Sequence, residues 1–286
     1  MEWGRAKKFV IVLLVILNAV LAMFNYRQGR ENTMTTAQER AIFEVLSQNG
    51  ISMYTELPKD IFARARISAK MPEYSKETLE RLFFGSDKTV VTVRGEQTIY
   101  RGEGVSLMMN GTRGVLLREN VAEGKGKTTK QEAEQLAQRF MDGTEHFFGT
   151  YGAPVVTEQK DGFRVDYHGQ YKREQIFANY FSIFVTDGGI RQIQFSYAPI
   201  QGYSGEKRDL CHPDEALLTF MRERKKEGAA LEVSVQHMEL GYERIEKNAA
   251  VADGEIYIEP CYRIYVMDEE KPYLVNAYTC QIVNQD

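Results

Sequence analysis

The sequence is poor in the residues on which several classes of protein depend. Three cysteines in 286 residues are too few for a scaffold held together by disulfides. Seven prolines and 23 glycines are too few for a chain made mainly of linkers, and 43% of the residues are apolar. The four histidines form no H-E-x-x-H motif, and no G-x-S-x-G motif occurs. We therefore expect a globular protein that is not an enzyme, with no catalytic residues, metal or cofactor.

Over most of the chain, basic residues are outnumbered by acidic residues. Residues 1–30 hold five basic residues against one acidic residue, whereas residues 31–286 hold 31 against 39. Because a nucleic-acid-binding surface needs clustered Lys and Arg, the acidic bulk argues against nucleic acid as a partner.

A long apolar run follows the basic start of the chain. Residues 9–26 read FVIVLLVILNAVLAMFNY without a charge, and as a helix they would span about 27 Å, close to the hydrocarbon core of a bilayer. The preceding Lys and Arg favour a cytoplasmic N-terminus. This predicts a cytoplasmic tail (1–8), a transmembrane helix (9–26), a juxtamembrane linker (27–34) and a bulk outside the cytoplasm. A signal peptide cleaved after residue 22, or a helix buried in a soluble protein, are the alternatives.

Three residues of this run share one helix face. Asn18, Ala22 and Asn25 repeat at i, i+4 and i+7, and polar or small residues in this pattern are typical of helix–helix contacts in membranes. They are therefore candidates for contact with another helix. The alternative is that Asn25 lies among the lipid head groups and Asn18 is tolerated alone.

The remaining sequence predicts two lobes. In the first lobe (35–124), Thr35 or Thr36 begins a helix that ends at Asn49-Gly50, Ser75 caps a short helix, and four short strands follow between residues 89 and 117. Asn110-Gly111 is typical of a hairpin turn between the last two of these strands.

The second lobe (125–286) follows a polar break rich in Gly and Lys. Thr128 or Thr129 caps a helix that runs to Phe148, and a second helix begins at Pro213. Each helix precedes strand-like segments, which gives two repeat-like units at 128–198 and 212–283. The expected fold class is α+β: one transmembrane helix, then helices packed on antiparallel sheets in duplicated units.

Two features of this second lobe leave alternatives open. Cys261 and Cys280 lie in strand-like segments that could pair, so a disulfide could join them outside the cytoplasm, with Cys211 left over. Nine aromatic residues lie between 167 and 203; core packing is one explanation, and a surface for peptide or glycan is the other.

Several short patches resemble one bacterial family. Residues 1–8 (MEWGRAKK), directly followed by the apolar run, resemble the start of the YycI proteins, which are membrane-anchored accessory regulators of the WalK/WalR (YycG/YycF) two-component system. Further patches similar to this family are 49–51, 57–58, 171–189, 236–242, 259–265 and 273–283. The resemblance implies a single-pass protein of the cell membrane, without catalytic residues, that regulates cell-wall homeostasis. Its implied partners are a WalK/YycG-like sensor histidine kinase, contacted through the transmembrane helix, and a YycH-like protein.

The closing strands also resemble PepSY modules, whose last strand often ends in a D-A-x-T-G run. This chain departs from that run, because Asn276 replaces the Asp and Cys280 replaces the Gly. This resemblance implies a second hypothesis: a binding module outside the cytoplasm, for peptide, glycan or protease, that makes no contact with a kinase.

Overall fold

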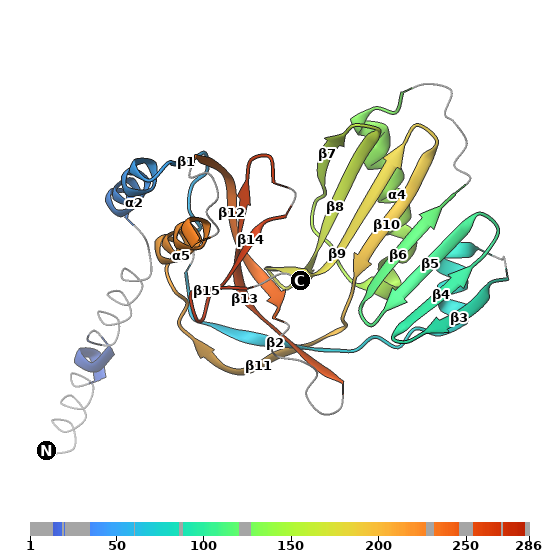
Figure 1. Ribbon diagram of the computed structural model, residues 1–286. Coiled ribbons are helices and arrows are strands. Elements are labelled where there is room, and N and C mark those ends of the chain that lie inside the picture. Colours follow the sequence, from blue (N-terminus) through green and yellow to red (C-terminus); the bar gives the residue numbers. More distant parts are fainter. Residues whose placement is uncertain are drawn as a thin grey trace, which may run out of the picture. The chain divides into compact units, whose positions relative to one another are not determined.

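A computed structural model describes residues 14–18, 20, 35–59, 61–85, 88–119, 127–226, 232–245, 254–269 and 271–283 (Figure 1). The chain divides into two compact units of discontinuous sequence. Unit 1 takes Met1–Arg64, Asp209–Glu239 and Tyr262–Asp286, and unit 2 takes Ala65–Arg208 and Leu240–Cys261. Strands β12 (Val233–Arg244) and β13 (Glu255–Val266) each contribute residues to both units.

Unit 2 contains an antiparallel sheet with the strand order β7-β8-β9-β10-β6-β5-β4-β3. Its sequential hairpins follow the turn signals of the sequence; in β5–β6, Asn110 pairs with Arg113 across a two-residue turn. Gly111 there has a φ of +56°, which glycine adopts without strain. The strand bounds are β3 Val90–Arg94, β4 Gln97–Arg101, β5 Val105–Asn110, β6 Arg113–Arg118, β7 Val155–Gln159, β8 Gly162–Tyr171, β9 Glu174–Thr186 and β10 Gly189–Ser196.

Helix α4 (Lys130–Phe148) packs on this sheet over β8, β9 and β10. Thr129 and Glu132 cap its start reciprocally. Near its end, Phe148 meets the rings of Phe181 and Phe195 edge-on, at centroid distances of 5.1 and 5.4 Å. A short helix, α3 (Lys76–Leu79), continues as the π-helical turn η1 (Glu80–Phe84) and joins the same core. Core packing is thus confirmed for Phe181 and Phe195.

A second group of strands completes unit 2. Strand β2 (Arg64–Lys70) lies between β11 (Ile200–Arg208) and β13, and Tyr242 of β12 pairs in parallel with Ile176 of β9. A separate apolar cluster, which includes Ile67, Ile256 and Ile258, fills the core of this region.

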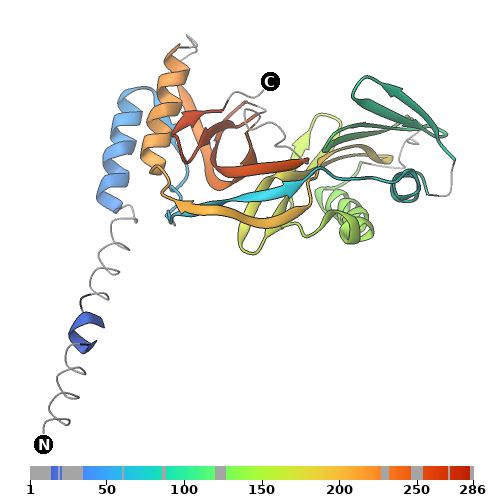
Figure 2. The ribbon, with the colours of Figure 1, turned by 90° about the horizontal axis from the view of Figure 1, so that it is seen from below.

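Unit 1 combines two helices with short strands. Helices α2 (Thr36–Gln48) and α5 (Pro213–Lys226) lie side by side (Figures 1 and 2). Strand β1 (Ile51–Met53) runs parallel to β12, while β14 (Tyr273–Asn276) pairs with β13 and with β15 (Gln281–Ile282). Helix α5 packs against β14 and β15.

The expected fold class is wrong. The described chain is dominated by a large mixed sheet, in which β1–β12 and β9–β12 pair in parallel rather than antiparallel fashion. The segment 212–283 is divided between units 1 and 2 at β12 and β13, whereas 128–198 lies within unit 2. The repeat-like units stay a prediction, and so does the boundary between residues 124 and 125, which falls outside the described residues.

In the described residues, no helix combines the length and the apolar character needed to cross a membrane. Of the expected span 9–26, the structure describes 14–18 and 20; the rest lies outside the described residues.

Candidate functional site

The structure describes one of the three residues expected to contact another helix. Asn18 lies on an exposed helical turn, where its side-chain amide donates a hydrogen bond of 3.0 Å to the carbonyl of Leu14. Ala22 and Asn25 lie outside the described residues. Their shared helix face therefore stays a prediction, and one donor of Asn18 is already satisfied within its own turn.

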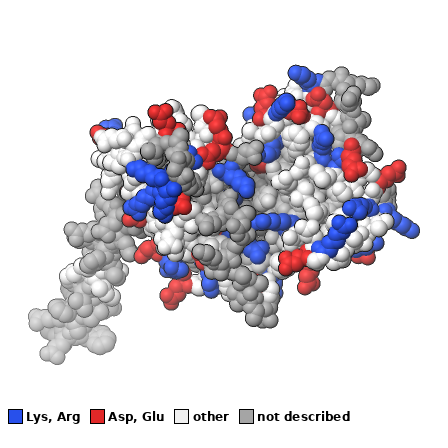
Figure 3. All heavy atoms as spheres, in the orientation of Figure 1, with Lys and Arg blue, Asp and Glu red and all other residues white. Residues whose placement is uncertain are grey.

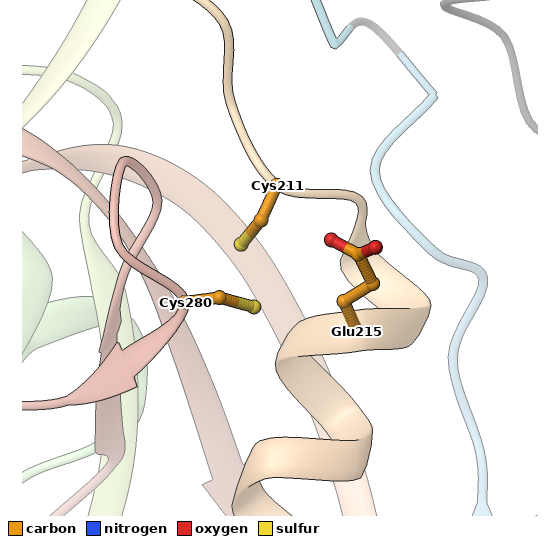
Figure 4. A group of neighbouring side chains, drawn as sticks. All are labelled: Cys211, Glu215 and Cys280. Atoms are coloured by element: carbon orange, nitrogen blue, oxygen red, sulfur yellow. The ribbon is translucent and has the colours of Figure 1, made fainter.

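The cysteines form a different arrangement from the expected one. All three are in the thiol form. The neighbour of Cys280 is Cys211: their Sγ atoms and a carboxylate oxygen of Glu215 all lie within 4.8 Å of one another (Figure 4). Cys261 is fully buried on β13, and its pairing with Cys280 stays a prediction.

Backbone hydrogen bonds place Cys211 at the entrance of α5. Its N–H donates to the carbonyl of Ala277 at 2.7 Å, and its carbonyl accepts from the Tyr262 hydroxyl at 2.7 Å. Pro213 then begins the helix, a position where its missing N–H costs nothing. Glu215, in the first turn, accepts a hydrogen bond from the His212 N–H at 3.3 Å. These contacts bring the Cys211 thiol and the Glu215 carboxylate together.

A tight turn between β14 and β15 presents Cys280. The Asn276 side chain accepts hydrogen bonds from the N–H groups of Tyr278 and Thr279, at 2.8 and 3.2 Å, as Asp or Asn does in an Asx turn. Cys280 ends the turn with a φ of +54°, in the left-handed region that disfavours residues with a Cβ. Its carbonyl accepts from the Thr219 hydroxyl at 3.1 Å, which ties the turn to α5.

The two thiols differ in acidity. The hydrogen bond between them, together with burial and the nearby carboxylates, raises the pKa of Cys211. The same hydrogen bond lowers the pKa of Cys280, against a smaller opposing effect of burial. Cys280 is thus the group that ionises first, and Cys211 is the donor that stabilises its thiolate.

A second feature lies at the end of the unit 2 sheet. Among the strands that the structure describes, β3 has β4 as its single hydrogen-bonded neighbour, so it is an edge strand. Val90 and Val93 are 70% and 69% exposed, and Val91 is also exposed. Edge strands with exposed apolar side chains are rare in proteins that work alone, because they pair with other chains.

The other edges of unit 2 are protected. Strand β7 follows Pro154 and carries Glu158, while β11 ends in Glu206-Lys207-Arg208. Charged residues and proline are the usual means of blocking an edge. Strand β7 exposes one valine, Val155, whereas β3 exposes three, Val90, Val91 and Val93.

The charged side chains within the strands next to β3 are all arginines, while acidic residues lie in the adjoining turns. The charged residues within strands β3 to β6 are Arg94, Arg101, Arg113 and Arg118, whereas Glu96 and Glu103 lie in the turns. Figure 3 shows Lys and Arg side chains gathered over this end of the sheet, at the lower right. An approaching strand with acidic side chains would be electrostatically favoured.

A polar hollow of about 680 Å³ lies elsewhere on unit 2, beside the β7–β8 and β9–β10 turns. Its walls mix acidic residues, such as Asp161 and Asp187, with the basic Lys160 and Arg191. Asp187 accepts a hydrogen bond of 2.8 Å from the Thr128 N–H ahead of α4, so it has a structural role.

The sequence contained partial signals for both features. Cys280 stands where a PepSY-like run has glycine. This substitution indicates a left-handed backbone at Cys280, but it does not reveal that Cys211 lies beside it. The Val90-Val91-Val93 pattern predicts a strand, but the position of a strand at the edge of a sheet depends on pairings that local sequence does not encode.

Comparisons with known proteins give a likeness of fold. No family model matches the chain, and no curated protein matches it. A crystal structure of an uncharacterised protein from Eubacterium rectale ATCC 33656 is similar over 86% of this chain and 99% of its own, at 11% identity and a TM-score of 0.54. The Bacillus megaterium YpeB C-terminal domain matches over 74% of this chain and 96% of its own, at 12% identity and a TM-score of 0.34. The first likeness concerns the fold alone, and the second is too weak to carry an argument.

Proposed function

We propose that this chain is a non-enzymatic regulatory protein that acts by binding other proteins, and that the edge of β3 is its binding surface. The observation that carries the proposal is the exposure of three valines, Val90, Val91 and Val93, on the edge strand β3. A partner strand that pairs with β3 would satisfy its outward backbone groups and cover these valines.

The chemistry of the edge indicates the kind of partner. Apolar side chains of an added strand would pack beside the valines, and acidic side chains would lie near Arg94 and Arg101. The expected occupant is therefore an extended, acidic segment of a partner protein.

The identity of the partners rests on the resemblance of the sequence to YycI proteins. On that basis, the partners are a WalK/YycG-like sensor histidine kinase and a YycH-like protein, and the process is cell-wall homeostasis. We place the chain at the cell membrane with its bulk outside the cytoplasm. Regulation would require that the complex favour one signalling state of the kinase over the other, since equal affinity for both states shifts nothing.

Charge placed on the edge tests this proposal. Val90→Lys combined with Val93→Lys in the full-length chain should reduce recovery of the kinase or the YycH-like protein at least tenfold on purification from native membranes. Val155→Lys is the matched control: Val155 is 58% exposed and lies on the protected edge strand β7. Equal recovery of these partners with all three proteins would contradict a role for β3.

The second candidate function is a binding module outside the cytoplasm for peptide or protease, without kinase contact. The same edge strand favours it, because strand addition accepts any extended peptide of suitable chemistry. Co-purification separates the two: recovery of a secreted or wall-associated protein that depends on β3, with no kinase, would support the module.

A further inference from the structure

We propose that Cys211 and Cys280 form a reversible disulfide that ties the start of α5 to the turn between β14 and β15. This site is independent of the β3 edge and of the proposed regulatory function. It is an alternative to the Cys261–Cys280 pair expected from the sequence, and it rests on the positions of the thiols.

Proximity is the first argument. The two Sγ atoms lie within 4.8 Å of each other, and the side chains point toward a common space (Figure 4). The backbones that carry them are joined by the hydrogen bond from Cys211 N–H to Ala277 carbonyl and by the bond from Thr219 to the Cys280 carbonyl. Movement of the two side chains toward each other would bring the sulfur atoms to bonding distance.

The backbone of Cys280 is the second argument. Its φ of +54° is a conformation that glycine adopts freely and that costs a residue with a Cβ. The Asx turn of Asn276 and the contact with Thr219 hold the residue there. A cysteine in a position suited to glycine indicates a use for its thiol.

Accessibility and acidity favour thiol exchange. Both cysteines are partly exposed, in contrast to the fully buried Cys261. Cys280 ionises first because Cys211 donates a hydrogen bond to it, and a thiolate is the species that attacks a disulfide.

The reaction balances with a small-molecule disulfide as oxidant. The Cys280 thiolate attacks one sulfur of the oxidant, whose sulfur–sulfur bond breaks, and the first thiolate leaves. Cys211 then gives up its proton and attacks Cys280 in the mixed disulfide, and the second thiolate leaves. Overall, two protein thiols are oxidised and one disulfide is reduced to two thiols, which take up the protons. Glu215 lies within reach to accept the proton of Cys211.

A metal site is the competing explanation for the same cluster. Two thiolates and a carboxylate are donors that Zn²⁺ accepts, but Glu215 is exposed and structural zinc sites have four protein ligands. Of the described His, Cys, Asp and Glu side chains, three converge here. We therefore favour the disulfide and treat metal binding as an outcome of the test.

The test uses the full-length protein, reduced and then exposed to oxidised glutathione. Peptide mapping without reductant should find Cys211 linked to Cys280 and the protein lighter by two hydrogens. The linked protein should melt roughly 5 °C or more above the reduced protein, because the bond closes the long loop from residue 211 to residue 280. Cys211→Ala and Cys280→Gly should each abolish the link, whereas Cys261→Ala should retain it.

Three results would overturn the proposal. The first is a link that involves Cys261 or a second molecule. The second is the persistence of both thiols after exposure to oxidised glutathione. The third is binding of one Zn²⁺ per chain that blocks oxidation in the wild type and is lost in Cys211→Ala, which would establish a metal site instead. Because the wild type alone gives the first two results, a variant that fails to fold does not prevent the test.

Discussion

Asn179 shows how a single side chain can serve as part of the backbone network. Its amide donates to the carbonyl of Ala198 at 3.0 Å and its oxygen accepts from the Ala198 N–H at 2.9 Å, all in a buried position. Asn179→Ala would leave both groups of Ala198 without these partners, so it should lower the free energy of unfolding by about 2–3 kcal/mol. Urea denaturation measures the change. Gln201→Ala, on an exposed side chain, is the control and should change it by less than about 0.5 kcal/mol.

Two tyrosines of unit 2 with buried hydroxyl groups should respond oppositely to loss of that hydroxyl. The Tyr242 hydroxyl donates to the carbonyl of Ala65 at 2.9 Å, whereas the Tyr151 hydroxyl has no hydrogen-bond partner in the described part of the chain. Burial accordingly raises the pKa of Tyr151. Tyr242→Phe should destabilise the protein by about 1 kcal/mol, and Tyr151→Phe should stabilise it by a similar amount. Destabilisation by both changes would contradict this explanation.

The acidity of Cys280 gives a prediction that depends on pH. Since the hydrogen bond from Cys211 lowers its pKa, Cys280 in the reduced protein should react with iodoacetamide at a lower pH than an ordinary cysteine. Its pH–rate profile should move to higher pH in Cys211→Ala, where the donor is missing. Mass spectrometry of alkylated peptides distinguishes Cys280 from the other two sites, and an unchanged profile in the variant would contradict the predicted interaction.

At the scale of elements, helix α5 is anchored near its end by one partly buried ion pair. Arg224 donates to Glu269 at 2.7 Å and to the Tyr273 hydroxyl at 2.8 Å. Arg224→Ala should cost about 2 kcal/mol, because these charge-assisted hydrogen bonds hold the last turn of α5 against the start of β14. Lys226→Ala removes an exposed pair with Glu223 and should cost less than about 0.5 kcal/mol. Comparison of thermal unfolding for the two variants measures the difference.

Elements with local signals were predictable from the sequence. A start at Thr35 or Thr36 and the Asn49-Gly50 stop predicted α2, and the structure places it at Thr36–Gln48 with a capping box at Thr35. The turns between residues 95 and 112 likewise predicted the hairpins of β3 to β6. These elements depend on residues that are near one another in the chain.

Pairings between distant segments were not predictable in this way. Strand β1 has three residues. It pairs with β12, where Ile51 lies opposite Val233, a residue far from it in the sequence. Strand β2 pairs with β13 at a similar separation. Nothing in the sequence of either strand identifies its partner. The sequence-based fold class therefore assumed antiparallel sheets throughout and missed the mixed sheet. The same limit concealed the Cys211–Cys280 cluster, whose two thiols lie just before α5 and in the β14–β15 turn.

At the scale of the whole molecule, the exposed valines of the β3 edge are the basis for the proposed regulation by protein contact. The fold alone is shared with a protein from Eubacterium rectale that has no characterised function, so function has to be argued from the surface. The valines of β3 and the arginines beside them provide that argument, and the resemblance to YycI proteins provides the names of the partners.

Co-purification of partners with the full-length chain from native membranes tests the central claim most directly. Wild type, Val90→Lys/Val93→Lys and Val155→Lys would be compared by quantitative mass spectrometry. We expect a sensor histidine kinase or a YycH-like protein to accompany the wild type and Val155→Lys, and its recovery to fall at least tenfold with Val90→Lys/Val93→Lys. Equal recovery with all three proteins, or the absence of both partners from the wild type, would contradict it.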